Sequence, residues 1–474
     1  MMQVESSRFR ERASEALLDP SLRAASEGLK RGFVAARAKR VAELPEYAAM
    51  RDAARDIRTH TLANLDFYLE RYESAVKAQG GHVHWAADAD EACAIIRDIC
   101  RDANAKVVTK GKSMVSEEIG LNAVLEAEGC EVLETDAGEY IVQLAHEAPS
   151  HIVTPTIHKT VEEIADLFYE RHRVYGFDKR ETDAAALIAQ VRHVMRQKYF
   201  AADVSLTGAN FLVAETGSNV IVTNEGNGDL ASMLAPVHVV TVGIEKIVPT
   251  LNDVSVLLRM LGRSALGMET TAYTTFMTGP KRAGDLDGPE EYHVVLIDNG
   301  RTKMLESEFR PMLRCIRCGA CMNHCPVYHS AGGHAYGWVY PGPMGSVLTP
   351  MIAGLEEAGD LPNACTLNGR CQQVCPVDIP LPDLLRRLRH EQWEAGFTKQ
   401  TVRWGIGLWA WLAARPRLYH GLTRLGVKML GLLGHKRGRF RHLPFAGGWT
   451  ATRDFPAPES ETFLAAWSNQ TKRS

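Results

Sequence analysis

Four cysteines lie close together at Cys315, Cys318, Cys321 and Cys325, and Pro326 follows at once. This C-x2-C-x2-C-x3-C-P run has the ligand spacing of a [4Fe-4S] cluster, because three thiolates two residues apart wrap one iron–sulfur cube in a tight loop. Zinc sites usually pair C-x2-C units across a longer gap, and disulfides need an oxidising compartment. The run therefore favours one-electron redox chemistry, with structural zinc and disulfides as the alternatives.

A second, imperfect copy of the run follows about fifty residues later. It consists of Cys365, Cys371, Cys375 and Pro376, and Asn368 stands where the spacing asks for another cysteine. Two clusters side by side would form a path for electrons.

The two runs predict crossed ligation. In two-cluster ferredoxins the fourth cysteine of a run binds the other cluster, and the proline turns the chain away. By this rule one cluster is held by Cys315, Cys318, Cys321 and Cys375, and the other by Cys365, Cys371 and Cys325. Asn368 leaves the second site one thiolate short.

The remaining cysteines and the histidine of the first run receive structural interpretations. Cys93, Cys100 and Cys130 lie in apolar periodic segments, where free cysteine usually behaves as a small buried hydrophobe. His324, inside the first run, is interpreted as a tuning or surface residue rather than an iron ligand.

Length and composition indicate a multi-domain globular protein. The chain has 474 residues, 45% of them hydrophobic, and a net charge of -3. Its first residues contain acids and no apolar core typical of a secretory signal, and its longest apolar stretch, 404–414, is too short to span a membrane. We therefore expect a cytoplasmic protein, a location that also suits clusters sensitive to oxygen.

The elements that must position these residues begin with helices over 1–78, where leucines recur at helical spacing. Strands are then predicted at 82–86, 105–109, 130–135, 151–154, 211–213, 220–223, 237–242 and 293–297, with helices at 90–103 and 116–128. Alternating strands and helices predict parallel βαβ units in an α/β domain.

Two loops of this α/β domain are candidate sites. Lys110 and Lys112 lie between a strand and a helix, where backbone N–H groups and two cations would suit a phosphate or carboxylate. The structural alternative is that Ser113 or Ser116 caps the helix and the lysines are solvated.

The second loop region contains Glu215 and Glu225, which have the chemistry of general acids or bases. No paired histidine or serine supports a catalytic assignment, so the catalytic residues stay unknown. Gly217 and Ser218 between two apolar runs predict a hairpin turn, and the segment 224–228 reads as a loop.

Four stretches carry a family resemblance. They are KSMVSEEIGLNAVLEAEG, GEYIVQLAHEAPSHIVTPTIHKTVEEIADLF, TGANFLVAETGSNVIVTNEGNGDL and GGHAYGWVYPGPMGSVLTP. Together they are similar to lactate utilisation protein B, an iron–sulfur subunit of a bacterial three-protein system that oxidises L-lactate. The similarity runs from about residue 76 to beyond residue 380.

The resemblance implies an α/β domain with a fold like that of ribose-phosphate isomerase and glucosamine-phosphate deaminase, followed by an α-helical two-cluster ferredoxin-like domain. It implies two partners, a cysteine-rich subunit like heterodisulfide reductase and a smaller lactate-utilisation subunit. The assembly would oxidise lactate to pyruvate while this subunit relays electrons. The alternative is an enzyme whose α/β domain acts directly on a small hydroxy acid or a phosphorylated substrate, with the clusters as internal acceptor.

The family's cluster ligands fall on Cys315, Cys318, Cys321, Cys325, Cys371 and Cys375. At Asn368 the chain departs from the four-cysteine pattern, and Cys365 would supply part of the missing ligation. The first cluster is thus expected to be [4Fe-4S], and the second either [4Fe-4S] with a non-cysteine ligand or [3Fe-4S].

The C-terminal segment is basic and amphipathic. No acid occurs between Glu394 and Asp454, while arginines and lysines alternate with tryptophans and leucines. Such a segment packs its apolar face against its own chain, docks on an acidic partner or lies peripherally on an anionic membrane surface. We rank membrane contact last. Nucleic acid is not expected, since no nucleic-acid module accompanies the segment. The expected parts are an N-terminal helical segment (1–78), an α/β lactate-utilisation domain (79–303), a ferredoxin-like two-cluster domain (304–395) and the basic amphipathic C-terminal segment (396–474).

Overall fold

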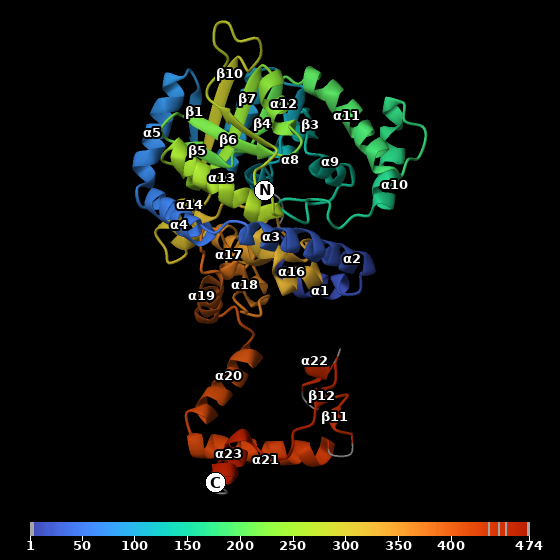
Figure 1. Cartoon of the computed structure of the whole chain (residues 1–474), viewed down its shortest axis with the longest axis vertical. Helices are drawn as coiled ribbons and strands as arrows, with labels where there is room; N and C mark the ends of the chain where they lie inside the picture. The colour runs from blue at the N-terminus through green and yellow to red at the C-terminus, as the bar shows by residue number, and fades with distance from the viewer. Residues whose placement is uncertain (1–3, 435–436, 444–445, 451–452, 472–474) are drawn as a thin grey trace. The chain divides into compact units, whose positions relative to one another are not determined.

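A computed structural model describes residues 4–434, 437–443, 446–450 and 453–471 (Figure 1). The chain forms two compact units, Met1–Glu391 and Gln392–Ser474. The first unit contains the N-terminal helices, the α/β part and both cysteine runs. The second is the basic C-terminal segment.

The N-terminal region is helical, as predicted. Its helices are α1 (Phe9–Ala16), α2 (Pro20–Leu29), α3 (Ala35–Ala42), α4 (Tyr47–Ala63) and α5 (Leu65–Ala78). Helix α4 packs against the α/β part, and α1 and α2 pack against the region of the cysteine runs. Two arginines, Arg37 and Arg51, donate hydrogen bonds to backbone carbonyls next to Cys375. These helices therefore hold the second cysteine run in place.

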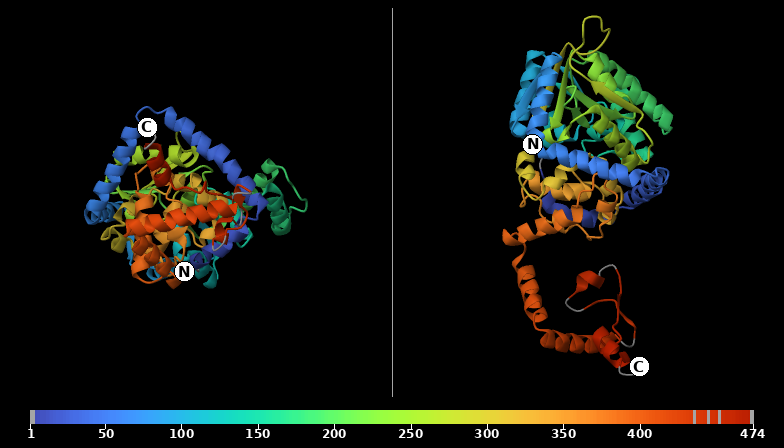
Figure 2. Two further views of the ribbon diagram at one scale, coloured as in Figure 1. Left: turned by 90° about the horizontal axis from the view of Figure 1, so that it is seen from below. Right: turned by 60° about the vertical axis from the view of Figure 1, so that its left-hand side comes forward.

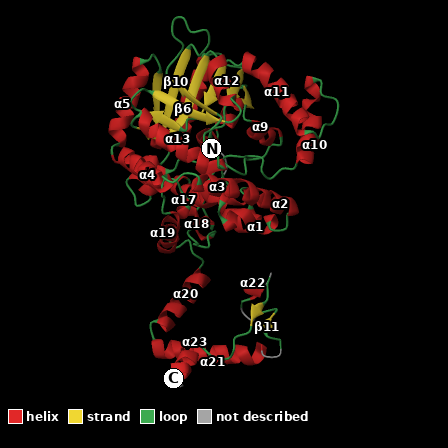
Figure 3. Ribbon diagram, viewed as in Figure 1, coloured by secondary structure: helices red, strands yellow, loops and turns green. Residues whose placement is uncertain are grey.

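A six-stranded parallel sheet forms the centre of the α/β part (Figure 3). In spatial order its strands are β1 (His82–Ala86), β10 (Glu291–Ile297), β7 (Val237–Gly243), β4 (Val204–Thr207), β2 (Val107–Lys110) and β3 (Glu131–Glu134). The central strands are nearly continuous runs of buried residues, because helices cover both faces of a parallel sheet. The predicted parallel α/β architecture is confirmed.

The helices that accompany this sheet lie between its strands in sequence. They are α6 (Ala89–Asp102), α7 (Met114–Ile119), α8 (Leu121–Ala127), α9 (Ala137–Leu144), α10 (Val161–Arg171), α11 (Ala184–Ala201), α12 (Asn227–Leu234) and α13 (Leu251–Leu266). Buried Ile96, Val108 and Val239 belong to one apolar core between the sheet and its helices.

A second sheet of four strands contains the predicted hairpin. Its order is β8 (Ile247–Val248), β5 (Phe211–Val213), β6 (Ser218–Thr223) and β9 (Tyr273–Met277). Strands β5 and β6 are antiparallel, with Val213 opposite Ser218. Gly217 in the turn has φ +70°, and a Cβ there would lie 2.7 Å from the backbone nitrogen of Val76. Glycine is therefore required by both conformation and space.

Two predicted elements are wrong. The single helix over 116–128 is two helices, because Gly120 adopts φ +69° and breaks the hydrogen-bond ladder between α7 and α8. The strand at 151–154 is a loop. Nδ1 of His151 accepts hydrogen bonds from the backbone N–H groups of Val153 and Thr154, which fold the chain into a turn.

Short helices surround the cysteine runs. They are α14 (Arg301–Leu305), α15 (Ala320–Asn323), α16 (Pro326–Ala331), α17 (Gly342–Ile352), α18 (Arg370–Gln373) and α19 (Leu381–Glu394). Their apolar residues join one core with residues of α4 and α13, including Met50, Leu257 and Leu385. The cysteine runs thus share a core with the elements that precede them. Figure 2 shows the short helices of this region next to the N-terminal helices.

The C-terminal unit contains α20 (Gln400–Ala413), α21 (Pro416–Gly434), β11 (Arg439–Phe440), α22 (Gly447–Thr450), β12 (Phe455–Pro456) and α23 (Phe463–Thr471). Many of its large apolar side chains face solvent. Trp404 is 74% exposed and Leu433 is 70% exposed. Packing within this unit alone therefore leaves these side chains uncovered. Among the described residues, no helix is long and apolar enough to cross a membrane.

A buried ionic network joins the α/β part to the first cysteine run. Arg301 pairs with Glu118 of α7 at 2.9 Å and with Glu245, directly after β7, at 2.6 Å. Arg317 of the first run lies 3.5 Å from Glu245, and the Tyr340 hydroxyl donates to Glu118 at 2.6 Å. Burial alone would raise the pKa of Glu245, but Arg301 and Arg317 lower it to about 2. The carboxylates therefore stay charged.

Removing the central cation of this network should destabilise the protein. Arg301→Met leaves two buried carboxylates without their main partner, and we expect a loss of about 3–5 kcal/mol in the free energy of unfolding. Urea unfolding of the whole chain, followed by circular dichroism, measures it. The control is Arg101→Met, because Arg101 pairs with Glu128 at the surface, and it should cost at most about 1 kcal/mol. Equal losses in both variants would contradict the role of the network.

Candidate iron–sulfur site and adjoining cavity

The two cysteine runs adopt the same backbone conformation. Arg317 and Leu367 have φ +57° and +55°, and Gly319 and Gly369 have φ +76° and +78°. Each run continues into a one-turn helix, α15 or α18, and ends at a Cys-Pro pair. Positive φ in a non-glycine residue is uncommon, so its recurrence at equivalent positions marks two copies of one ligand loop.

Backbone N–H groups point at four of the sulfur atoms. The nitrogens of Arg317 and Leu367 donate to Sγ of Cys315 and Cys365 at 3.4 and 3.3 Å. Sγ of Cys325 and of Cys375 each accept one such bond, at 3.5 and 3.4 Å. Hydrogen bonds to cluster sulfur are one way in which proteins set reduction potentials. These donors fit a bound cluster.

The first group of cysteines contains the fourth cysteine of the second run. Burial, followed by the neighbouring Cys375 and Cys315 thiolates, raises the pKa of Cys318 to about 12. Burial also raises the pKa of Cys321, and the charges of Cys318 and Cys315 raise it further. Cys371 of the other group also raises the pKa of Cys321, so the two groups adjoin.

The second group contains the fourth cysteine of the first run. Burial, followed by Cys365 and Cys325, raises the pKa of Cys371 to about 12. All ten cysteines are free thiols. Thiols buried together resist ionisation unless a cation compensates their charge, and bound iron supplies that charge. The burial of these thiols beside one another therefore favours a bound metal centre, and none of the ten cysteines forms a disulfide in the structure.

Asn368 occupies the position in the second loop that Cys318 occupies in the first. Cys318 is only 8% exposed, whereas Asn368 faces solvent. The Asn368 Oδ1 atom accepts a hydrogen bond from the backbone nitrogen of Arg370 at 3.0 Å and so begins helix α18. The missing thiolate is thus at the solvent-facing side of the second loop.

The other cysteines and His324 match their structural interpretation. Cys93, Cys100 and Cys130 are buried, and burial raises the pKa of Cys100 to about 12. His324 Nδ1 donates to the carbonyl of Ala320 at 2.9 Å, and burial lowers the pKa of this imidazole to about 4. His324 is therefore a neutral residue that stabilises the loop.

A cavity of about 520 Å³ lies between the α/β part and the first cysteine loop. Lys112, Asn224 and Glu225 line it from the α/β part, and Arg317 and Cys318 line it from the cysteine loop. In open α/β sheets, ligands bind in the crevice at the carboxyl ends of the strands. A ligand here would lie next to a cysteine of the first group.

Lys246 is the most unusual residue of this cavity. Its side chain is 5% exposed, and it makes no hydrogen bond or ion pair with any residue that the structure describes. Burial, followed by the charge of Arg317, lowers the pKa of Lys246 to about 7. An ammonium group at a cavity wall without an anionic partner within 4 Å among the described residues indicates a ligand site. Sequence reasoning missed Lys246, although its position just after an apolar strand was a usable signal.

The structure separates the two lysines of the first candidate loop. Lys110 is fully buried between Glu117, at 2.5 Å, and Glu134, so it does not face a ligand. Lys112 lines the cavity and donates to the Val153 carbonyl at 2.9 Å. The prediction that both lysines form one anion site is therefore wrong, and only Lys112 remains a candidate anion ligand.

The remaining residues of the two loops have structural contacts. Ser113 caps α7, as in the structural alternative, by accepting a hydrogen bond from the Ser116 nitrogen at 3.2 Å. Glu215 accepts a hydrogen bond from the backbone nitrogen of Leu251 at the start of α13. Glu225 lines the cavity, and burial raises its pKa.

Comparison with known proteins agrees with this geometry. Residues 69–297 match the LUD domain, and residues 311–379 match the 4Fe-4S dicluster domain. An α/β LUD domain followed by a dicluster iron–sulfur domain defines the class of this protein. It is similar to lactate utilization protein B of Bacillus velezensis, with 42% identity over 489 residues that cover 100% of this chain and 99% of that protein.

Two further relatives cover nearly the whole chain. Lactate utilization protein B of Bacillus subtilis (strain 168) is 42% identical and covers 98% of this chain and 96% of its own. The uncharacterized electron transport protein YkgF of Escherichia coli (strain K12) is 43% identical, and the match covers 96% of this chain and 95% of that protein. The chain belongs to the lactate utilization protein B family, and the similarity extends through the C-terminal segment.

One solved structure is also similar, a DUF162 family protein from Deinococcus radiodurans. It is 14% identical with a TM-score of 0.28, and it covers 49% of this chain and 98% of its own.

The different surroundings of the two lysines give a stability prediction. Lys110→Met should cost about 3–5 kcal/mol in the free energy of unfolding, because it leaves the buried Glu134 carboxylate without its cation. Lys112→Met removes one hydrogen bond and a 3.8 Å ion pair with Glu139. Burial raises the pKa of Glu139 to about 8, so this carboxyl takes up a proton when Lys112 is removed, and the variant should cost about 1 kcal/mol. Urea unfolding of both variants measures the difference. A loss in Lys112→Met as large as that in Lys110→Met would contradict this assignment.

Proposed function

We propose that this chain is the iron–sulfur electron-transfer subunit of a complex that oxidises L-lactate to pyruvate. The observation that carries the proposal is the pair of adjoining thiol groups, each assembled from both cysteine runs. The names of the relatives, lactate utilization protein B and an electron transport protein, support the same role. The clusters would supply one-electron redox chemistry when bound.

The ligand assignment follows the two groups. Cys315, Cys318, Cys321 and Cys375 hold a [4Fe-4S] cluster. Cys365, Cys371 and Cys325 hold a second cluster, [4Fe-4S] with a non-thiolate ligand at the Asn368 position or [3Fe-4S]. The Asn368 side chain would have to leave the Arg370 nitrogen to reach iron, so water is the competing fourth ligand.

The remaining parts of the proposal concern fold and partners. The α/β domain is proposed to share the fold of ribose-phosphate isomerase and glucosamine-phosphate deaminase. The partners are a cysteine-rich subunit like heterodisulfide reductase and a smaller lactate-utilisation subunit. The exposed tryptophans and leucines of α20 and α21 support docking of the C-terminal segment on a partner. We place the complex in the cytoplasm, with membrane contact through this segment as the lesser alternative.

The assignment predicts which cluster loses iron. Mild oxidation of the intact protein should give a three-iron paramagnetic resonance signal from the second cluster only, because its fourth iron lacks a thiolate. Asn368→Cys should suppress this signal by supplying one. Cys375→Ser should damage the first cluster and leave the three-iron signal, whereas Cys325→Ser should damage the second.

Iron and sulfide counts accompany each spectrum and serve as the control for cluster content. If the three-iron signal persists undiminished in Asn368→Cys and vanishes in Cys375→Ser, the labile iron belongs to the first cluster and the assignment fails.

A second candidate function is direct binding of the hydroxy acid by this chain. It is favoured by the unpaired Lys246, which together with Arg317 would neutralise a carboxylate beside Cys318. Oxidation of a 2-hydroxy acid to a 2-oxo acid releases two electrons and two protons. Two neighbouring one-electron centres would together accept both electrons.

Lys246→Met tests this second candidate. Charge-assisted hydrogen bonds contribute about 1.5–3 kcal/mol, so the variant should bind L-lactate and pyruvate roughly 10–150-fold more weakly than the cluster-containing wild type. Equilibrium dialysis with labelled acid measures the affinity. The control is Lys106→Met, an exposed lysine next to the opposite end of β2. Absence of binding to the wild type, or equal affinity in both variants, would contradict direct binding and leave the relay proposal intact.

A further inference from the structure

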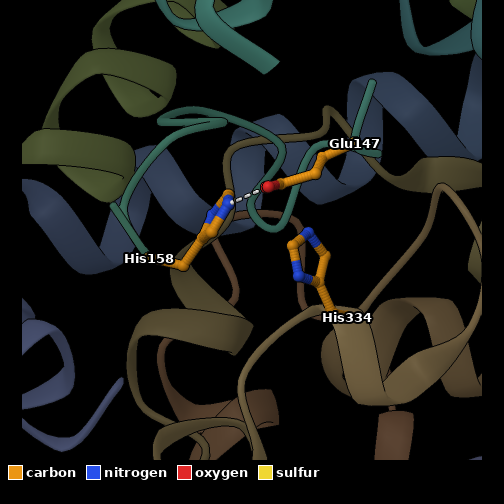
Figure 4. Close-up of side chains that lie close together, drawn as sticks. All are labelled: Glu147, His158 and His334. Atoms are coloured by element: carbon orange, nitrogen blue, oxygen red, sulfur yellow. Dashed lines mark hydrogen bonds and ion pairs between the residues drawn. The ribbon is translucent and has the colours of Figure 1, made fainter. Parts of the chain in front are cut away.

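Three potential metal ligands, none of them a cysteine, lie close together in the structure (Figure 4). Glu147 and His158 lie on the loop between α9 and α10, and His334 begins the short 3-10 turn after α16. Each residue offers one ligand atom, and these atoms lie within 4.8 Å of one another. The three side chains come from two parts of the chain about 180 residues apart.

The hydrogen bonds of His158 determine which of its nitrogens is free. The Ser150 hydroxyl donates its only hydrogen to the Pro155 carbonyl at 3.0 Å. Nδ1 of His158 lies 2.7 Å from the same hydroxyl oxygen, and in the tautomer that satisfies both contacts of this hydroxyl Nδ1 carries the hydrogen and donates it. In the neutral ring, Nε2 then holds a lone pair.

That lone pair faces another acceptor. Nε2 of His158 lies 2.8 Å from Oε2 of Glu147, and a neutral imidazole and a carboxylate would repel each other there. A metal ion bound by both atoms would remove this repulsion.

His334 is oriented in the same way. Its Nε2 lies 2.7 Å from the Ala148 carbonyl, which can only accept, so Nε2 donates and Nδ1 keeps a lone pair. The rings of His158 and His334 have centroids 4.4 Å apart. A histidine that donates one N–H to a fixed oxygen and presents the other nitrogen has the orientation typical of metal-bound histidines.

The carboxylate keeps one oxygen for a metal. Lys159 pairs with Oε1 of Glu147 at 2.7 Å, which leaves Oε2 on the side of His158. All three residues line a cavity of about 1010 Å³, so water would have access to further coordination positions. Two histidines and one carboxylate form the donor set of open zinc sites and of other open transition-metal centres.

We infer that Glu147, His158 and His334 bind one divalent transition-metal ion of the zinc class. The ion would tie the α9–α10 loop to the turn that contains Tyr336, whose hydroxyl hydrogen-bonds to Cys325. It would thereby connect the α/β part to the second cysteine group.

Zinc binding to the cluster-loaded protein tests the inference. The protein is dialysed against chelator, titrated with Zn²⁺, and analysed for zinc, iron and sulfide. The wild type should bind one equivalent. Ser150→Ala, which removes the hydrogen bond to His158, should weaken binding roughly 10–100-fold, and His158→Ala and His334→Ala should weaken it more.

The matched control is His146→Asn, which changes a histidine of the same cavity wall outside the three ligands. Asparagine tolerates its φ of +55°. This variant should bind zinc like the wild type. Unchanged cluster absorbance in every variant shows that folding is retained, and any variant that loses it is replaced by the milder Ser150→Ala.

X-ray absorption at the zinc edge distinguishes this site from the cysteines. Nitrogen and oxygen neighbours at roughly 2.0–2.2 Å, with no sulfur near 2.3 Å, are expected. Sulfur neighbours, no bound zinc in the wild type, or equal loss of zinc in His146→Asn would each overturn the inference.

Discussion

The buried pairing of Arg301 with Glu118 and Glu245 is the interaction on which the arrangement of the first unit depends. Its members lie on α7, after β7 and at the start of α14, and Arg317 extends it to the first cysteine loop. Separating these elements would leave an uncompensated charge in the interior, at a cost of about 3–5 kcal/mol. The first cysteine loop is thereby fixed against the α/β part.

This constraint gives the two cysteine loops different surroundings. The first loop forms a wall of the cavity that contains Lys246, whereas the second exposes Asn368 and is held by Arg51 of α4. The first site therefore faces the α/β part, and the second has a solvent-facing edge. An electron path through both would run between the cavity and the surface, where a partner could exchange electrons.

The loop between α9 and α10 provides a second connection between the same parts. His151 of this loop hydrogen-bonds to Asn323 of the first run at 2.9 Å, and burial lowers its pKa to about 4. The same loop carries Glu147 and His158 to His334. Three of the four stretches that carry the family resemblance, 112–129, 138–168 and 332–350, thus contain contacts between the two parts.

The sequence by itself determined the features that arise from local spacing. Cysteine spacing predicted two ligand loops, apolar runs predicted the parallel strands, and Gly217 predicted the hairpin, because each depends on neighbours within a few residues. The prediction of a strand at 151–154 was wrong because the His151 side chain accepts hydrogen bonds from the backbone that follows it and folds it into a turn. The partners of Arg301 are 56 and 183 residues away, and those of Lys110 lie on α7 and β3. Only the tertiary structure could decide which charges are paired, that Lys246 is left unpaired at a cavity, and that two histidines and a glutamate meet, because burial and contact between distant segments have no local pattern.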